Sequence, residues 1–169
     1  TGATYYVATT GSDSSNGQLS TPFKTIQHGV DAAWAGDTVI VYPGTFAGHV
    51  DYEGKSIVLA SRILESGNEA YTDSTIIEGI VTINDGVDST ALFSGFTITG
   101  DYGNRGLSIT SDDGVIINHI KVLEAGGVEF VNAVATMHDV VIKDNTYSGH
   151  GAGISILSST VDLVNVVID

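Results

Sequence analysis

The chain contains no cysteine among its 169 residues, and it carries six lysine or arginine residues against 20 aspartates or glutamates. The missing cysteines exclude a disulfide framework, a thiolate metal site, an iron–sulfur cluster and a cysteine nucleophile. The net charge of −14 removes the cationic surface on which nucleic-acid binding depends, so we expect no nucleic-acid partner. The hydrophobic content of 42% still suffices to fill the core of one domain.

The sequence also lacks long apolar segments and does not start with a methionine. No stretch approaches the roughly 18 to 20 unbroken apolar residues that span a bilayer, so we expect no membrane insertion. The start at Thr1 leads us to expect a secreted or cell-surface protein from which a signal peptide has been removed.

Proline is scarce and glycine abundant, with 2 and 21 residues. Short runs of Val, Ile and Thr alternate with clusters of Gly, Asn, Asp and Ser, which is typical of an all-β chain. Residues 21–35 instead predict a helix, with Thr21 as N-cap, Pro22 as first helical residue and Gly36 in the left-handed conformation after the last turn. The apolar residues at helical spacing are Phe23, Ile26, Val30 and Trp34.

Two columns of similar segments recur in step after Gly36. The first column begins at Gly95, His119, Asp139 and Asn165, and the second at Gly79, Gly106, Gly127 and Gly153. Successive members lie about 20 to 27 residues apart, which predicts a parallel β-solenoid of about six rungs. A leucine-rich repeat is excluded by its missing Leu-x-x-Leu-x-Leu pattern, and a β-sandwich does not require two columns in step. We therefore expect one domain, with a strand, loop and capping helix over residues 1–36 and the rungs over residues 37–169.

The N-terminal segments follow a characteristic order. They are Tyr5-Tyr6-Val7, Gly11-Ser12-Asp13, Asn16-Gly17, Thr21-Pro22-Phe23-Lys24-Thr25-Ile26-Gln27, Ala35-Gly36-Asp37-Thr38-Val39 and Pro43-Gly44-Thr45-Phe46. This order resembles the opening of secreted right-handed parallel β-helix proteins of the pectate-lyase-like superfamily, from Tyr5 to about Ser61. The resemblance implies a short helix that closes one end of a right-handed parallel β-helix. The superfamily includes polysaccharide lyases, hydrolases, epimerases, phage tailspikes and structural proteins, so the fold does not name the function.

If the chain were a lyase, the resemblance would imply a Ca²⁺ ion held by carboxylates and a lysine or arginine that removes a proton from the glycan. The weak candidates for that base are Lys121, Lys143 and Arg105. Lys121 and Lys143 belong to strands of one column, where a solvated face of mixed charge is the favoured interpretation and a small ladder beside Asp139, Asp144 and Glu124 is the alternative. The candidate Ca²⁺ ligands are Asp85, Asp88, Asp112 and Asp113, although ordinary turns explain these residues equally well. The polar interval 61–74 interrupts the period and is predicted to be a protruding loop.

The last residues predict an uncapped terminal rung, which exposes unpaired main-chain groups and the apolar section of the core. We expect association through this rung and the N-terminal strand, and the candidate interface residues are Val164, Val166, Val167, Ile168, Asp169, Tyr5 and Tyr6. The favoured hypothesis is a secreted, non-enzymatic structural module that assembles head to tail with itself into a filament or array, or that continues into the remainder of a longer β-helix. The alternatives are a Ca²⁺-dependent lyase of acidic polysaccharide and a glycan-binding adhesive module.

Overall fold

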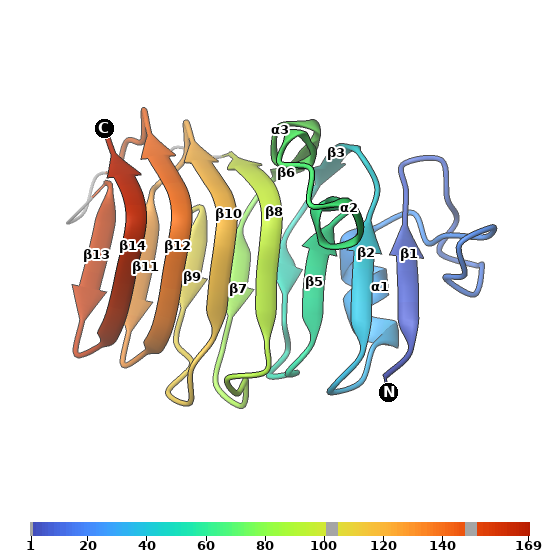
Figure 1. Cartoon of the computed structure of the whole chain (residues 1–169), viewed down its shortest axis with the longest axis horizontal. Coiled ribbons are helices and arrows are strands. Elements are labelled where there is room, and N and C mark those ends of the chain that lie inside the picture. Colours follow the sequence, from blue (N-terminus) through green and yellow to red (C-terminus); the bar gives the residue numbers. More distant parts are fainter. Residues whose placement is uncertain (1, 101–104, 148–151) are drawn as a thin grey trace.

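The computed structural model describes residues 2–100, 105–147 and 152–169, which fold into two sheets and three short helices. Every pairing between strands in these residues is parallel. The expected all-β class with parallel strands is therefore confirmed. Figure 1 shows the strands side by side along the long axis of the molecule, with the N- and C-terminal strands at opposite ends.

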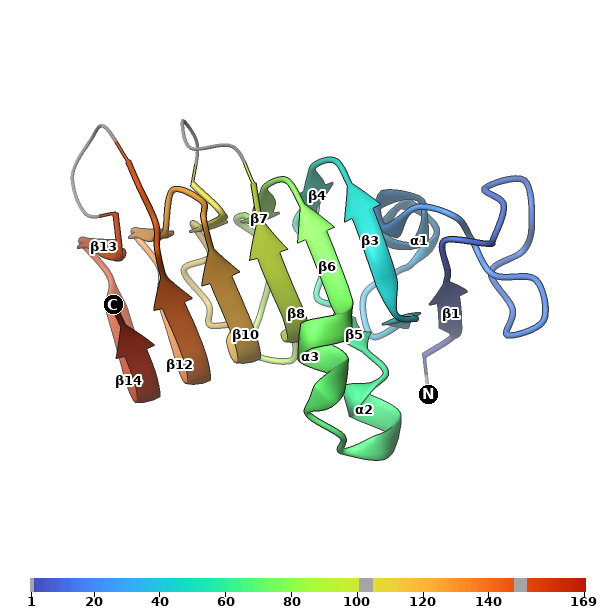
Figure 2. The ribbon, with the colours of Figure 1, turned by 90° about the horizontal axis from the view of Figure 1, so that it is seen from above.

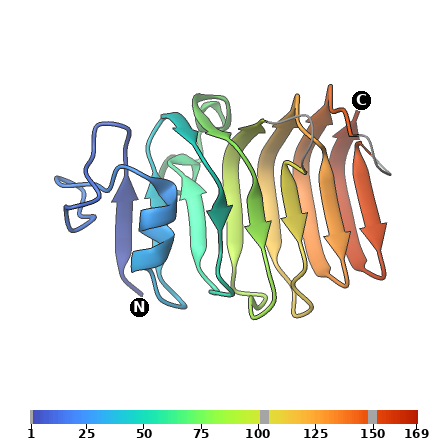
Figure 3. The ribbon, with the colours of Figure 1, turned by 180° about the vertical axis from the view of Figure 1, so that it is seen from behind.

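The larger sheet is built mainly from strands that follow one another along the chain. Its spatial order is β1 (Thr4–Val7), β2 (Thr38–Val41), β5 (Val58–Ser61), β8 (Leu92–Thr99), β10 (Ile116–Leu123), β12 (Val134–Lys143) and β14 (Thr160–Ile168). A branch of β3 (Gly44–Ala47) and β6 (Thr75–Glu78) joins this sheet through β8. The smaller sheet has the order β13 (Ile154–Leu157), β11 (Val128–Val131), β9 (Leu107–Ile109), β7 (Val81–Ile83) and β4 (Val50–Asp51), and Figure 3 shows it in front of the larger one.

The core lies between the sheets and consists of apolar side chains stacked in register. Along the larger sheet, Val39, Leu59, Phe93, Ile117 and Met137 are aligned on neighbouring strands, and all are fully buried. Each strand alternates such inward residues with outward ones, because successive side chains of a strand point to opposite faces. The repeat in the sequence therefore places like residues on top of one another.

The first column of repeats is confirmed by the strand register, since Phe96, Ile120, Val140 and Val166 are aligned on neighbouring strands. The second column is confirmed except at its first member. Val81 pairs with Leu107, so the position aligned with Gly106 belongs to Ile80, and Gly79 lies one residue too early.

The N-terminal helix is shorter than the sequence predicts. Helix α1 (Ile26–Ala32) begins after Thr25, whose hydroxyl oxygen accepts a hydrogen bond from the main chain of His28. The predicted cap at Thr21 is wrong because residues 21–23 are extended, and Phe23 forms a bridge with Val7 of β1. Trp34 lies beyond the helix and is 78% exposed, so its predicted place on the buried face is also wrong.

The interval 61–74 is not the loop that we expected. It forms α2 (Ile63–Ser66) and α3 (Ala70–Ser74), which project beside the larger sheet in Figure 2. The Thr97 hydroxyl donates to the carbonyl of Thr72, and the Thr72 hydroxyl donates to the carbonyl of His119, at 2.8 and 3.2 Å. These bonds fix α3 against the sheet. None of the helices in the described ranges has the length and apolar character required to cross a membrane.

Candidate functional site

A groove of about 370 Å³ lies between α3 and the outer face of β10, β12 and β14. Its polar lining residues are Glu69, Thr72, Asp73, His119, Lys121, Asp139 and Asn165. The groove combines carboxylates, a lysine, an imidazole and an amide on a rigid sheet, which makes it the candidate functional site. Its volume is at the lower end of the range for small-molecule sites.

The strands bend at one column of residues in the left-handed conformation. Gly95, His119, Asp139 and Asn165 have φ values of 83°, 52°, 56° and 53°. The residues on either side of each bend pair normally, as Asn118 does with Ser94 and Ile120 with Phe96. Besides Gly, the residue types Asn, Asp and His tolerate positive φ best. The Gly–His–Asp–Asn column was therefore a sequence signal for this bend, and it brings polar side chains to the groove.

Asp139 is held in a hydrogen-bonded chain on the outer face. One carboxylate oxygen lies 3.0 Å from Nδ1 of His138, and the other accepts a bond of 3.1 Å from the amide of Asn165. The hydrogen bond from His138, followed by that from Asn165, holds the pKa of Asp139 below its usual range. The Nε2 atom of His138 lies 3.3 Å from the amide nitrogen of Asn118. Asp139 therefore stays ionised and orients the His138 ring, an arrangement that sequence reasoning missed.

Lys121 forms an ion pair with Asp73 of α3, across the mouth of the groove. Their side chains are 35% and 65% exposed, so water reaches the pair. An ammonium group has three N–H donors, and the pair with Asp73 uses one of them. Lys121 is thus placed to donate hydrogen bonds to a ligand, and Asp73 is a groove residue that the sequence did not reveal.

The three predicted base candidates lie at separate places. Lys121 aligns with Val141 and Lys143 aligns with Leu123, so the two lysines do not stand opposite each other and the alternative of a lysine ladder is wrong. Lys143 pairs instead with Asp169 at 3.3 Å.

Arg105 is the third base candidate, and its side chain is only 8% exposed. Its guanidinium donates to the Gly126 carbonyl, pairs with Glu129 at 3.1 Å, and lies 3.9 Å from the Tyr147 ring centroid. A guanidinium is always protonated under ordinary conditions, and this one is held by Gly126, Glu129 and Tyr147 among the described residues. The geometry favours a structural role for Arg105.

The candidate calcium ligands lie in two connecting segments, one between β7 and β8 and the other between β9 and β10. Asp88 and Asp113 form an isolated parallel bridge, and Asp88 accepts hydrogen bonds from the main chain and hydroxyl of Thr90. The Thr90 hydroxyl and main-chain N–H hold the pKa of Asp88 below its usual value. Within the described ranges, no group of three or more His, Asp or Glu residues is placed to hold a metal ion. Calcium binding at Asp85, Asp88, Asp112 and Asp113 stays a prediction.

The C-terminal edge exposes a section of the apolar core, which we call the terminal face. Its members are Ile154, Ile156, Val161, Leu163, Val166 and Ile168, which lie in register over the buried residues Val128, Phe130, Ala135, Met137, Val140 and Ile142. Ile156, Leu163 and Ile168 are 46%, 42% and 54% exposed. Among the described strands, β13 pairs only with β11 and β14 only with β12.

The register divides the predicted interface residues into two groups. Val166 and Ile168 belong to the terminal face, whereas Val164 and Val167 align with the outward residues His138 and Val141. Asp169 follows β14 and pairs with Lys143. The sequence missed Ile156 and Leu163 because exposure at an open end depends on the strand order.

The opposite end of the larger sheet is covered by the chain itself. Tyr6 of β1 donates to the Gly17 carbonyl and accepts from the Phe23 N–H, while the Ala8 N–H donates to the Phe23 carbonyl. The Tyr5 ring stacks on Phe23 with 5.9 Å between centroids. The outer edge of β1 is therefore occupied, in contrast to that of β14.

Comparisons with known proteins add little to this geometry. No protein-family model and no curated protein matches the chain. A solved structure of a rhamnogalacturonan lyase aligns with 98% of this chain and 56% of its own, at 15% identity and a TM-score of 0.36. The chain thus spans little more than half of that protein, and a likeness at this level supports no statement about function.

Proposed function

We propose that the chain is a secreted right-handed parallel β-helix module of about six rungs, structural rather than catalytic, which associates with a second copy through its terminal face. The observation that carries this proposal is the row of core side chains open to solvent on β13 and β14. Unpaired strand edges that expose apolar side chains are templates for association. The separation of Lys121, Lys143 and Arg105, each with a carboxylate partner, supports a non-enzymatic role.

The association that fits both ends is tail to tail. Head-to-tail stacking would bring β14 against β1, where main-chain groups of Gly17 and Phe23 already occupy the edge. A two-fold axis across the terminal face instead lays β14 antiparallel to its copy, and likewise β13. Such a contact is isologous and closes as a dimer, whereas a head-to-tail contact gives an open filament.

The expected dimer is weak. Full burial of a Leu or Ile side chain contributes about 1.5–3 kcal/mol, so covering three half-exposed residues on each copy contributes about 6 kcal/mol. Loss of translational and rotational freedom costs about 4–15 kcal/mol, which main-chain pairing between the edges offsets in part. Since the net gain is then smaller than about 6 kcal/mol, we expect a dissociation constant on the order of 100 µM or weaker. The charge of −14 on each copy should weaken the dimer further at low salt.

Sedimentation of residues 1–169 tests the proposal. We expect a reversible monomer–dimer equilibrium that shifts toward monomer when the ionic strength is lowered from about 0.5 M to about 0.02 M. Addition of Ca²⁺ and of a chelator then tests whether the ion contributes to screening. Filaments would contradict the tail-to-tail geometry. A monomer at every concentration would refute self-association and favour the alternative in which further rungs of a longer chain cover the terminal face.

The groove beside α3 favours a second candidate function, the binding of a glycan. Sugar hydroxyls both donate and accept hydrogen bonds, and the groove presents acceptors at Asp73 and Asp139 beside donors at Lys121 and Asn165. If the module also binds glycans, it would act as an adhesive. A Ca²⁺-dependent lyase at this site is the weaker alternative, since Lys121 is already engaged in the ion pair with Asp73.

Affinity electrophoresis in gels that contain pectate, alginate or a neutral glycan tests this candidate, with and without Ca²⁺. Lys121→Ala should abolish any retardation, whereas Lys143→Ala removes the same charge outside the groove and should leave it unchanged. Retardation that is equal in both variants would assign binding to another surface. New ultraviolet absorbance on incubation with pectate or alginate, lost in Lys121→Ala, would establish the lyase instead.

A further inference from the structure

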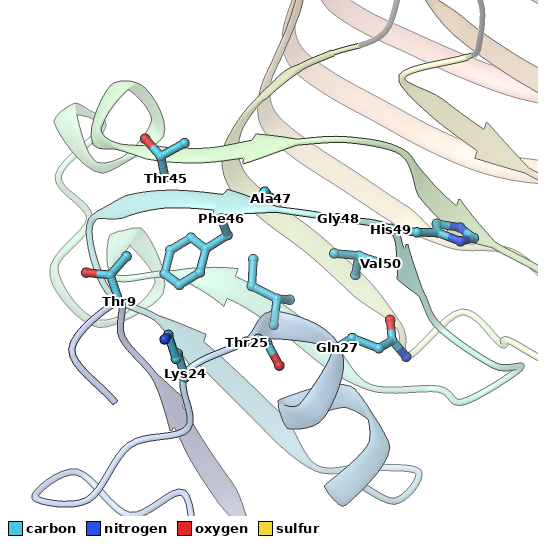
Figure 4. A pocket seen from close by; sticks show the side chains of 11 residues that line it. Thr9, Lys24, Thr25, Gln27, Thr45, Phe46, Ala47, Gly48, His49 and Val50 are labelled. Carbon is cyan, nitrogen blue, oxygen red and sulfur yellow. The ribbon is translucent and has the colours of Figure 1, made fainter. Parts of the chain in front are cut away.

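A second cleft, of about 250 Å³, lies at the N-terminal end between the start of α1 and the strands β3 and β4. Figure 4 shows Lys24, Thr25 and Gln27 on one side and residues 45–50 on the other, with the Phe46 ring between them. No part of the functions proposed above uses this cleft.

The wall formed by β3 is an open strand edge. Within the described residues, β3 pairs with β6 and with no other strand. The Gly48 N–H donates to the Glu78 carbonyl of β6, and the main-chain groups of alternate residues in a strand point to opposite edges. Those of Thr45 and Ala47 therefore point away from β6, toward the cleft. Both residues are exposed.

The adjoining part of the same edge is already occupied by an amide group. The Asp51 N–H of β4 donates to Oε1 of Gln27 at 2.7 Å, and the Asp51 carbonyl accepts from Nε2 of Gln27 at 3.2 Å. The side-chain amide thus makes the donor and acceptor bonds that a neighbouring strand would make. In the described part of the chain nothing comparable pairs with β3, although its edge continues into the cleft.

The chemistry of the cleft restricts its occupant. The floor of the cleft is apolar and consists of Phe46, Ile26 and Val50, each of which is at most 7% exposed. The lining contains Lys24 and His49 but no carboxylate, although the chain carries 20 of them. An occupant with an apolar side chain and a carboxylate is complementary to these walls.

We propose that this cleft binds a short extended peptide segment of a partner protein, which pairs with the free edge of β3, packs an apolar side chain against Phe46 and places a carboxylate near Lys24. The main-chain hydrogen bonds of an added strand supply affinity, and the side-chain contacts supply selectivity. The proposal does not depend on the terminal face, which lies at the other end of the molecule (Figure 1).

The probe is the acetylated and amidated pentapeptide Asp-Val-Asp-Val-Asp, titrated into isotopically labelled protein and followed by NMR. Two analogues, N-methylated at the valines or at the aspartates, each remove one of the two sets of main-chain donors that can face β3. We expect the parent peptide to shift the amide signals of Thr45, Ala47 and His49. One analogue should bind at least tenfold more weakly than the other. Equal affinity of all three peptides would show that no strand is added and would overturn the proposal.

Two protein variants test the two halves of the contact. Ala47→Pro removes the N–H on the open edge, which an edge strand tolerates, and should weaken binding at least tenfold without loss of the folded circular dichroism spectrum. Lys24→Gln should weaken binding several-fold, whereas Lys143→Gln, with the same change of charge elsewhere, should not. If Ala47→Pro does not fold, the pair of methylated analogues still decides. Absence of any shift at residues 45–49 with millimolar parent peptide would also refute the proposal.

Discussion

The terminal face can be tested with two neighbouring residues of β14 that point in opposite directions. Leu163 lies in register over the buried Met137, whereas Val164 lies over the outward residue His138. Val164 is the more exposed of the two, at 52% against 42%. A ranking by exposure would therefore choose Val164 as the interface residue, while the register chooses Leu163.

We compare Leu163→Asp with Val164→Asp, which change the net charge equally. Covering a half-exposed Leu contributes about 1 kcal/mol, and an isologous dimer contains this contact twice. The new carboxylate must also lose its hydration or lie beside the same carboxylate of the second copy. The total loss of dimerisation free energy is therefore about 3 kcal/mol or more. This corresponds to a rise in the dissociation constant of more than 100-fold for Leu163→Asp. For Val164→Asp we expect a change below about fivefold, because only the longer-range charge term remains.

Sedimentation equilibrium at about 0.15 M salt measures both constants, at an ionic strength where surface charges more than about 8 Å apart are largely screened. Thermal unfolding by circular dichroism checks that each variant keeps its fold. Leu163→Ala provides a milder change that adds no charge and should raise the dissociation constant by about tenfold or more. Equal effects of the two aspartates, or a larger effect at Val164, would refute the assignment of the terminal face.

Three further predictions concern the stability of the single chain. Arg105→Lys should lower the free energy of unfolding by about 2 kcal/mol in urea titrations, because an ammonium cannot hold Glu129, Gly126 and Tyr147 together; a change below about 0.5 kcal/mol would contradict this role. Gly95→Ala should cost more than about 2 kcal/mol, since φ is 83° and the new Cβ would lie 2.2 Å from the Ser61 hydroxyl and 2.4 Å from Cγ2 of Ile63 in α2. A near-neutral result would mean that Ser61 and α2 move aside freely. Asp13 accepts hydrogen bonds from Lys24 and Thr25. Burial raises its pKa, but the bonds from Thr25 and Lys24 outweigh burial and leave the pKa lowered. Because the folded pKa is lowered, the carboxylate stabilises the protein above the unfolded pKa of about 4, and this contribution is lost as the pH falls through the folded value. Asp13→Asn should therefore cost about 1 kcal/mol at pH 7 and progressively less toward pH 3, and urea titrations that give the same difference at both pH values would contradict this assignment.

The strand pattern was accessible from the sequence because its physical causes are local. Alternating apolar residues and turn residues recur in step, and equivalent positions of the repeat, such as Ile120 and Val140, align in the sheet. The helix was located but its start was misplaced, because Pro22 and Thr21 read as a helix start while Phe23 is held extended by its pairing with β1. Local preferences were overruled there by a contact with a distant strand. The same applies to the interval 61–74, where α3 is fixed by the hydrogen bonds of Thr72 with Thr97 and His119.

The candidate site was less predictable. Lys121 was identified, but its partner Asp73 is 48 residues away in the chain and reaches it only because α3 lies over β10. Lys121 and Lys143 do not stand opposite each other, because the register aligns Lys121 with Val141, as the first column of repeats does, and places Lys143 two residues further along β12. Similarity of segments fails at Gly79, whose alignment is off by one residue, and a one-residue shift moves every side chain to the other face.

By itself, the sequence determined the class of fold, the repeat, the negative charge and the absence of cysteine chemistry, because these follow from composition and from periods along the chain. The tertiary structure alone decided which side chains meet in the groove, which edge of β1 is covered and which residues of β14 lie in register over the buried core. Each of these depends on strand order, register and direction over distances of 20 residues or more. The contrast between Leu163 and Val164 is the clearest case, since both are apolar, adjacent and exposed, yet only one stands over the core.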